Sequence, residues 1–171
     1  IGPGDAVITT PFTFAATSNV IIQRNAHPIF VDIEPDTFNL DPKKIEAVIT
    51  EKTKAIMPID YGGQSAEILE INEIAGKHGL AVIEDAAPAL GGVHKNKKVG
   101  SISTMTGFSF GPDKNLNTGE GGLIVTNDNE LAEKCKILRK NGADRRYHHV
   151  EIGWNAKMPD PNAALGISQL K

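Results

Sequence analysis

The run Ala81-Val82-Ile83-Glu84-Asp85 has the pattern of a buried β-strand, because three apolar residues lead into two carboxylates. β-Branched residues such as Val82 and Ile83 favour an extended backbone. Similar short apolar runs recur on both sides of this stretch, and each of them predicts a strand. These runs are residues 6–10, 28–32, 53–59, 107–110 and 122–126.

Segments with a helical spacing of apolar residues lie between the predicted strands. Residues 13–24 predict a first helix. Its predicted inner face carries Ala16, Val20 and Ile21. The pair Asp41-Pro42 predicts the start of a second helix that runs through residue 49, because Asp caps helices and Pro fits the first helical position.

Two further helices are predicted later in the chain. Residues 66–78 form the first, which Gly79 closes in a left-handed conformation. Asp128 caps the second, in which Cys135 lies on the apolar stripe, and Gly142 ends it. The alternation of strands and helices predicts one α/β domain with a mostly parallel sheet and helices on both faces.

Composition and charge argue against several classes of function. The 171 residues carry 18 Lys and Arg against 21 Asp and Glu, so the chain has no basic footprint and we expect no nucleic-acid partner. No apolar run reaches the roughly 20 residues of a membrane helix. Cys135 is the single cysteine, which excludes an internal disulfide. We expect a packed thiol, no bound metal and a cytoplasmic location.

Candidate site residues follow the predicted strands, since sites in parallel sheets lie at the carboxyl ends of strands. Neither a dinucleotide-binding nor a P-loop glycine motif is present. Asp85 either caps the next segment or keeps a heterocyclic nitrogen protonated, as a pyridoxal ring requires. Lys114 is either a solvated lysine or a partly desolvated amine that forms a Schiff base. Ser109 could bind a phosphate, and residues 60–64 either line the pocket or turn the chain.

The order of these signals resembles the DegT/DnrJ/EryC1/StrS family of pyridoxal-phosphate enzymes, chiefly sugar aminotransferases of the aspartate-aminotransferase fold type. The resemblance covers essentially the whole chain. It rests on residues 4–17 (GDAVITTPFTFAAT), 31–38 (VDIEPDTF), 82–87 (VIEDAA), 108–110 (FSF) with Lys114-Asn115, 119–122 (GEGG), and 153–158 (GWNAKM) with 163–166 (AALG).

The resemblance implies a role for each of five residues. Lys114 matches the lysine that carries pyridoxal 5'-phosphate, and Asp85 matches the carboxylate that pairs with the pyridine nitrogen. Phe14 matches the aromatic residue that stacks on the ring, and Ser109 matches a phosphate ligand. Asn155 matches an asparagine that reaches the phosphate of the neighbouring subunit's site, which implies a homodimer.

The chain also departs from the family pattern. Pro88 stands where His or Gln is usual and cannot supply a side-chain hydrogen bond to the ring. Lys157 stands where Arg is common, and the two recognise anions differently. Family members are longer at both ends, with an earlier phosphate-binding helix and a smaller C-terminal domain. We therefore expect residues 1–171 to be part of the large domain, with strand 122–126 at an open sheet edge.

The resemblance implies small-molecule substrates: an amino acid, glutamate by family habit, as amino donor, and a keto sugar linked to a nucleotide as acceptor. One alternative is a sugar dehydratase with the same cofactor, although those relatives have histidine in place of Lys114. A second alternative is a non-catalytic fragment or ligand-sensing module, which the missing phosphate-binding helix favours.

Overall fold

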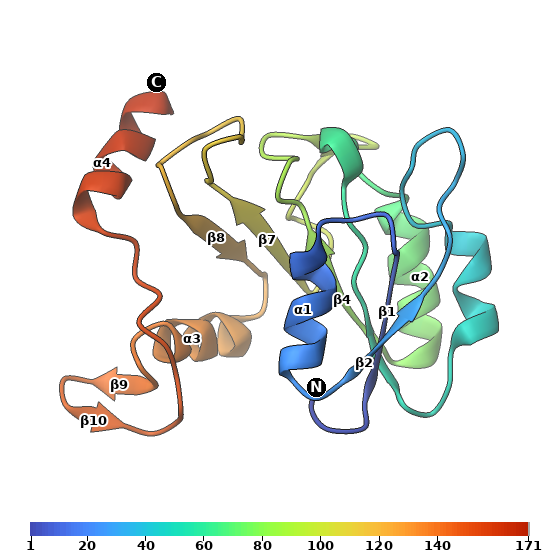
Figure 1. Ribbon diagram of the computed structural model, residues 1–171, viewed down its shortest axis with the longest axis horizontal. Coiled ribbons are helices and arrows are strands. Elements are labelled where there is room, and N and C mark those ends of the chain that lie inside the picture. Colours follow the sequence, from blue (N-terminus) through green and yellow to red (C-terminus); the bar gives the residue numbers. More distant parts are fainter. Residues whose placement is uncertain (171) are drawn as a thin grey trace.

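The computed structural model describes residues 1–170, and a six-stranded sheet runs through its centre (Figure 1). The strands follow the order β2-β1-β3-β4-β7-β8, and all neighbours are parallel except β7 and β8. The predicted α/β fold with a mostly parallel sheet is confirmed. The strands are β1 (Ala6–Thr9), β2 (His27–Phe30), β3 (Thr53–Ile56), β4 (Ala81–Asp85), β7 (Met105–Ser109) and β8 (Gly122–Val125).

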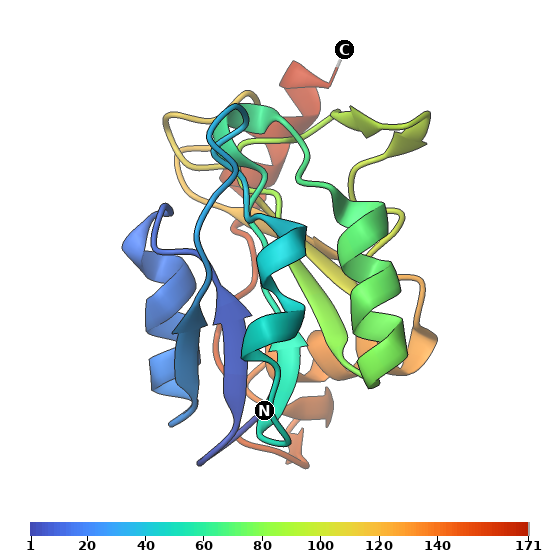
Figure 2. The same ribbon diagram turned by 90° about the vertical axis from the view of Figure 1, so that its right-hand side faces the viewer.

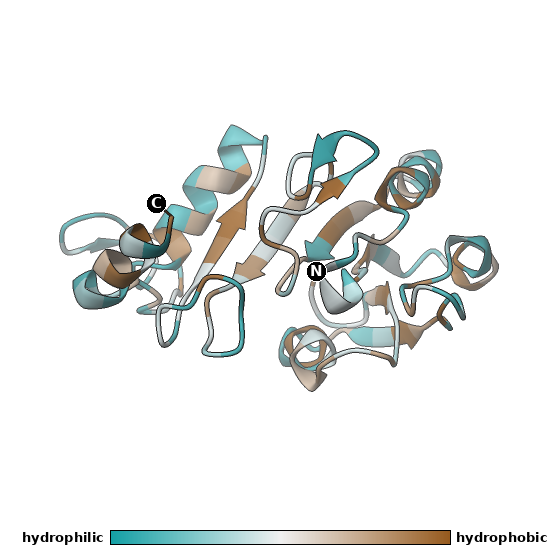
Figure 3. Ribbon diagram, turned by 90° about the horizontal axis from the view of Figure 1, so that it is seen from above, coloured by the Kyte–Doolittle hydropathy of each residue, from teal (hydrophilic) through white to brown (hydrophobic). Residues whose placement is uncertain are grey.

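Successive strand residues face opposite sides of the sheet and enter two separate cores. On one side Val7 and Ala55 pack with Ile21 of α1 (Ala15–Gln23). On the other side Ile8 and Ile56 pack against α2 (Ile68–His78). Helices therefore cover both faces of the sheet (Figures 1 and 2). In Figure 3, hydrophobic colour is concentrated on the central strands and hydrophilic colour on outer parts of the helices.

The last third of the chain lies beside the antiparallel end of the sheet. It contains α3 (Asn129–Leu138), the hairpin of β9 (Ala143–Arg145) and β10 (His148–His149), and α4 (Asp160–Gln169). Asn162 on α4 donates a hydrogen bond to the Thr118 carbonyl oxygen at 2.6 Å, which ties this helix to the turn before β8. A second small hairpin, β5 (Val93–His94) with β6 (Lys97–Lys98), lies between β4 and β7 in the sequence.

The predicted burial of the first helix is only partly correct. Ile21 is buried, but Ala16 and Val20 are exposed, and Thr17 takes the second buried position. Thr17 and Ile21 are four residues apart and therefore share one helix face. Ala16 and Val20 each precede one of these residues and lie on the neighbouring face. The sequence pattern missed this face because one of its two buried residues is polar.

The predicted helix over residues 41–49 is wrong. Asp41 does cap a helical turn by accepting a hydrogen bond from the Lys43 amide. The chain then forms two short 3₁₀ turns, η1 (Pro42–Lys44) and η2 (Glu46–Val48). The segment is too short to offset helix nucleation, and its β-branched end favours extended backbone. The later helices match their predictions more closely, and Gly79 closes α2 at φ 65° as expected.

Strand β8 lies at the edge of the sheet, as predicted. Its residues Leu123 and Ile124 are 45% and 58% exposed, so the described part of the chain leaves apolar side chains open there. Cys135 on α3 is half-buried near this edge rather than fully packed. Among residues 1–170, no helix combines the length and the apolar character needed to cross a bilayer.

Candidate active site

The loops that follow β1, β3, β4 and β7 line an open cavity of about 780 Å³ at the carboxyl ends of these strands. Four of the five predicted site residues line it: Phe14, Asp85, Ser109 and Lys114. Its volume lies within the range of roughly 300–1,000 Å³ that is usual for small-molecule sites. The parallel sheet thus brings together residues that are far apart in the sequence.

Asp85 ends β4 at the floor of this cavity, and both of its carboxylate oxygens have donors. Oδ2 accepts a hydrogen bond from the Thr17 hydroxyl at 2.9 Å, and Oδ1 accepts one from the Ala87 amide at 3.2 Å. Neither donor carries a charge. The carboxylate is therefore held in a fixed orientation and remains able to bind a cationic group in the cavity.

Lys114 lies in the loop between β7 and β8, and its side chain is 25% exposed. Its Nζ donates a hydrogen bond to Asp113 Oδ2 at 2.9 Å. This bond and the lysine charge lower the pKa of Asp113. The amine is the one cationic side chain among the described residues that line the cavity. It lines the same cavity as the Asp85 carboxylate, which is the arrangement that the sequence predicted.

Phe14 and Ser109 occupy the rim and the wall of the cavity. Phe14 precedes α1 and is 80% exposed, so its ring has an open face toward a ligand. The Ser109 hydroxyl accepts a hydrogen bond from the Gly111 amide at 3.2 Å, which leaves its own proton available as a donor. Pro88 also lines the cavity and supplies no polar side-chain atom there.

Asn155 lies elsewhere. It forms an isolated antiparallel bridge with Lys140 and is not among the residues that line the cavity. The structure therefore does not bring it to the site of its own chain. The role in a neighbouring subunit that the sequence suggested stays a prediction.

Thr17 is a positioning residue that the sequence analysis missed. Its hydroxyl is buried, donates to Asp85, and lies 2.9 Å from the hydroxyl of Thr13. A threonine four residues after another threonine at the start of a helix gives no distinctive sequence signal. Its importance appears only when β4 is placed beside α1.

Thr17→Val is expected to weaken cofactor binding by about tenfold or more, because a hydrogen bond to a charged group contributes ~1.5–3 kcal/mol. Valine keeps the β-branched shape, so α1 should remain folded. The Kd for pyridoxal phosphate, measured by absorbance titration of the apo full-length protein, checks this. Ser18→Ala, next to Thr17 on α1 and not among the residues that line the cavity, is the control and should leave Kd unchanged. Equal Kd values for Thr17→Val and wild type would contradict the role.

Two buried carboxyl groups lie beneath the cavity, next to Asp85. Asp60 accepts a hydrogen bond from the Ala66 amide through Oδ1, and Glu84 accepts from the Ser103 and Thr106 hydroxyls through Oε2. Burial, followed by the charge of Glu84, raises the pKa of Asp60 to about 7. The remaining oxygens, Asp60 Oδ2 and Glu84 Oε1, accept from no donor among the described residues. If Asp60 keeps its proton, its carboxyl group can donate a hydrogen bond to the Glu84 carboxylate, which gives both oxygens a partner.

This pair predicts that stability falls as pH rises. The unfolded chain loses the Asp60 proton near its ordinary value of 3.8, but the folded chain keeps it until about pH 7. The folded state therefore binds more protons between these values, so the free energy of unfolding decreases across this window and is level above it.

Urea unfolding of the wild type and of Asp60→Asn at pH 5 and pH 8 tests the pair. Wild type should lose up to ~3 kcal/mol over this interval relative to the variant. The asparagine cannot ionise, and its carbonyl oxygen still accepts from the Ala66 amide. The exposed Asp36→Asn is the matched control and should follow the wild type. If Asp60→Asn shows the same pH dependence as the wild type, Asp60 does not hold its proton.

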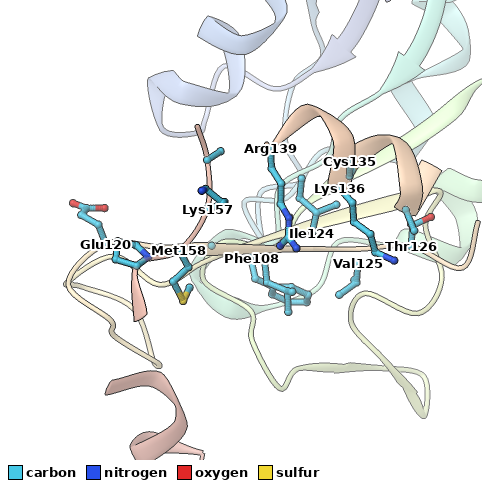
Figure 4. A pocket seen from close by; sticks show the side chains of 17 residues that line it. Phe108, Glu120, Ile124, Val125, Thr126, Cys135, Lys136, Arg139, Lys157 and Met158 are labelled. Carbon is cyan, nitrogen blue, oxygen red and sulfur yellow. The ribbon is translucent and has the colours of Figure 1, made fainter. Parts of the chain in front are cut away.

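A second cavity of about 860 Å³ lies along β8 and α3 (Figure 4). Cys135 and Lys136 approach it from α3, Arg139 from the residue that follows this helix, and Lys157 and Met158 from the chain before α4. None of the five predicted site residues lines it. It is larger than the first cavity, and its lining carries one acid, Glu120, and three cations, Lys136, Arg139 and Lys157.

The sequence profile of the DegT/DnrJ/EryC1/StrS aminotransferase family matches residues 1–171. The chain belongs to this family. The resemblance suggested by the motifs is thus confirmed over the whole sequence.

Three curated relatives of the chain carry different names. The chain is 51% identical to a pleiotropic regulatory protein of Geobacillus stearothermophilus, covering 96% of this chain and 45% of the relative. It is 47% identical to GDP-perosamine synthase of Caulobacter vibrioides, covering 100% and 47%. It is 45% identical to UDP-2-acetamido-2-deoxy-3-oxo-D-glucuronate aminotransferase of Pseudomonas aeruginosa, covering 100% and 48%. The chain therefore spans about half the length of these family members.

Two solved structures share the fold of the chain. NtdA from Bacillus subtilis, solved with bound cofactor PMP, superimposes with a TM-score of 0.94 at 37% identity, covering 99% of this chain and 39% of that one. A family aminotransferase from Brucella abortus superimposes with a TM-score of 0.96 at 38% identity, covering 99% and 48%.

The residues that line the first cavity fit pyridoxal phosphate. Asp85 offers a fixed carboxylate with no cationic partner among the described residues, which suits a protonated ring nitrogen. Lys114 offers a primary amine, and Phe14 offers an open ring face. The side chains of this lining that can donate to an anionic phosphate are Lys114 and the hydroxyls of Ser109, Thr13 and Tyr61. Lys114 is the one cation among them, so the described lining supplies little positive charge for such an anion.

Proposed function

We propose that the protein is a pyridoxal-phosphate-dependent aminotransferase. It would move an amino group from an amino acid, glutamate in our proposal, to a keto sugar linked to a nucleotide. The observation that carries this proposal is the single cavity that joins the Lys114 amine with the Asp85 carboxylate. The family supports the reaction type, and the UDP- and GDP-sugar names of two relatives support the class of acceptor.

Bound pyridoxal phosphate would supply an aldehyde carbon that condenses with amines and a ring that takes up electrons from the substrate. Lys114 is the residue proposed to hold it, through Nζ. When that amine is free, Nζ takes a proton from the substrate carbon and later returns it, acting first as a base and then as an acid. When the Lys114 amine is charged, its hydrogen bond to Asp113 keeps the amine at the cavity.

Asp85 would hold a proton on the ring nitrogen, which keeps that nitrogen cationic. The Thr17 hydroxyl and the Ala87 amide fix the carboxylate in the orientation for this contact. Phe14 would orient the ring by stacking, and Ser109 would donate a hydrogen bond to the phosphate. We further propose that Asn155 acts in the site of a second copy, so that the working unit is a homodimer, and that this single-cysteine protein works in the cytoplasm.

Product analysis of the full-length protein tests the proposed function. With pyridoxal phosphate, glutamate and nucleotide-linked keto sugars, we expect an amino sugar and 2-oxoglutarate in equal amounts. A deoxygenated keto sugar formed together with 2-oxoglutarate and free ammonia, with no amino sugar, would instead indicate a dehydratase, because glutamate would then supply the two electrons that the loss of the hydroxyl requires. If pyridoxal phosphate binds but neither product forms, the protein is not an aminotransferase, and the alternative of a ligand-sensing module is favoured.

A further inference from the structure

Three aromatic rings form a cluster beside the site cavity, in a chain with only 5% aromatic residues. Phe12 and Tyr61 line the cavity, and Phe38 packs against both of them. The ring centroids of Phe12 and Tyr61 are 4.8 Å apart. The ring centroid of Phe38 lies 5.5 Å from that of Phe12 and 5.8 Å from that of Tyr61. We call these three residues the aromatic platform. Each is about two-fifths exposed, at 40%, 44% and 39% for Phe12, Phe38 and Tyr61, so the rings keep open surface beside the cavity.

The backbone holds one of these rings in a conformation that costs energy and places another beside a close-fitting turn. Phe38 has φ 62°, in the left-handed region that bulky residues seldom adopt. Tyr61 is followed by Gly62 and Gly63, both at positive φ. A Cβ at Gly63 would lie 3.0 Å from the Pro88 carbonyl oxygen, so this turn fits closely against the cavity wall. A strained position that only exposed an aromatic ring to water would have no benefit to offset its cost.

A buried amide fastens two parts of the platform together. Asn39, which is 1% exposed, donates to the Gln64 carbonyl oxygen at 3.0 Å and accepts from the Tyr61 amide at 2.8 Å. It therefore joins the loop that carries Phe38 to the turn that carries Tyr61. The third ring is fixed separately, because the Phe12 amide donates to the Thr10 hydroxyl at 3.2 Å.

The platform continues the site cavity, because Phe12 and Tyr61 line the same cavity as Lys114. The other charged residues of that lining are acids: Asp85, Asp113 and Glu120. The described chain thus gives an anionic acceptor little charge attraction beyond the lysine. Open aromatic faces can instead bind a nucleobase by stacking. Stacking depends on the flat face of the base and not on the hydrogen-bonding groups at its edge.

We propose that the aromatic platform binds the nucleobase of the nucleotide-linked acceptor by stacking while its keto sugar reaches toward Lys114. This inference rests on the proposed function. Stacking tolerates both pyrimidines and purines, which agrees with a family whose relatives are named for UDP and for GDP sugars. Specificity for one base would then come from groups outside the platform.

Nucleotide binding tests the platform apart from the reaction. The probes are UDP and GDP, titrated calorimetrically into the cofactor-loaded full-length protein. Tyr61→Leu and Phe12→Leu are each expected to weaken binding of both nucleotides by about tenfold, the loss that follows from removing one stacking ring. Tyr61→Phe should bind as wild type does. The matched control is Phe30→Leu, on β2, which removes a phenylalanine that is 50% exposed but does not line the cavity.

Kinetics provide the second measurement. In platform variants, the KM for the nucleotide-linked acceptor should rise about tenfold more than the KM for the amino donor. If Tyr61→Leu and Phe12→Leu bind UDP and GDP as tightly as the wild type and use the amino donor at the wild-type rate, the platform does not bind the nucleobase. If wild type transfers no amino group, the proposed function fails, and the nucleotide titrations still decide whether the platform binds a base.

Discussion

Lys114→Ala is expected to lower the rate of amino transfer by at least about 10³-fold, because the same amine is proposed to hold the cofactor and to move the proton. The side chain is partly exposed and, among residues 1–170, its one ion pair is with the exposed Asp113, so its loss should leave the fold intact. Steady-state transfer from glutamate to a nucleotide-linked keto sugar measures the effect, and far-ultraviolet circular dichroism checks the fold.

Two companion variants show whether the chemistry of Lys114 or only its charge matters. Lys114→Arg keeps the positive charge beside Asp113, but a guanidinium does not give up its proton near neutral pH. It should be as inactive as Lys114→Ala. Lys97→Ala removes an exposed lysine on β6 and should retain wild-type activity. Substantial activity in Lys114→Arg would show that the residue serves only as a charge.

Asp85→Asn has the second-largest expected effect, a loss of about 10²–10³-fold in amino transfer. An amide has nearly the shape of the carboxylate, but it cannot stabilise a cationic ring nitrogen, and a preorganised charge of this kind is worth a rate factor of that order. Transfer rate and Kd for pyridoxal phosphate are measured together, since both should worsen. Asp36→Asn, at an exposed position, is the matched control. Wild-type transfer by Asp85→Asn would remove Asp85 from the site.

Much of the fold follows from local signals. The strand over residues 81–85 was predicted with the observed bounds, and Gly79 ends α2 as its position indicated. The failures have tertiary causes. The face of α1 depends on the Thr17 hydroxyl reaching Asp85, and residues 41–49 are too short and too β-branched for one α-helix.

The candidate site was partly predictable for a geometric reason. Parallel strands place their carboxyl ends at one edge, so Asp85, Ser109 and Lys114 could be expected to meet there. Asp60 belongs to residues 60–64, which the same rule marked as a possible pocket lining, but no sequence signal paired it with Glu84, since only the alignment of the chain after β3 with β4 brings the two together. Tyr61 lies in residues 60–64 and lines the cavity, as one of the two interpretations of that stretch expected. Its contacts with Phe12 and Phe38 were not predictable, because the three rings come from separate loops and only the fold brings them together.

The position of the cofactor is the central claim, and trapping it covalently tests this claim most directly. The full-length protein loaded with pyridoxal phosphate is treated with borohydride, digested and mapped by mass spectrometry. We predict one reduced pyridoxyl group, on Nζ of Lys114, and none after the same treatment of Lys114→Arg. A pyridoxyl group on another lysine, or none on the wild type, would contradict the account.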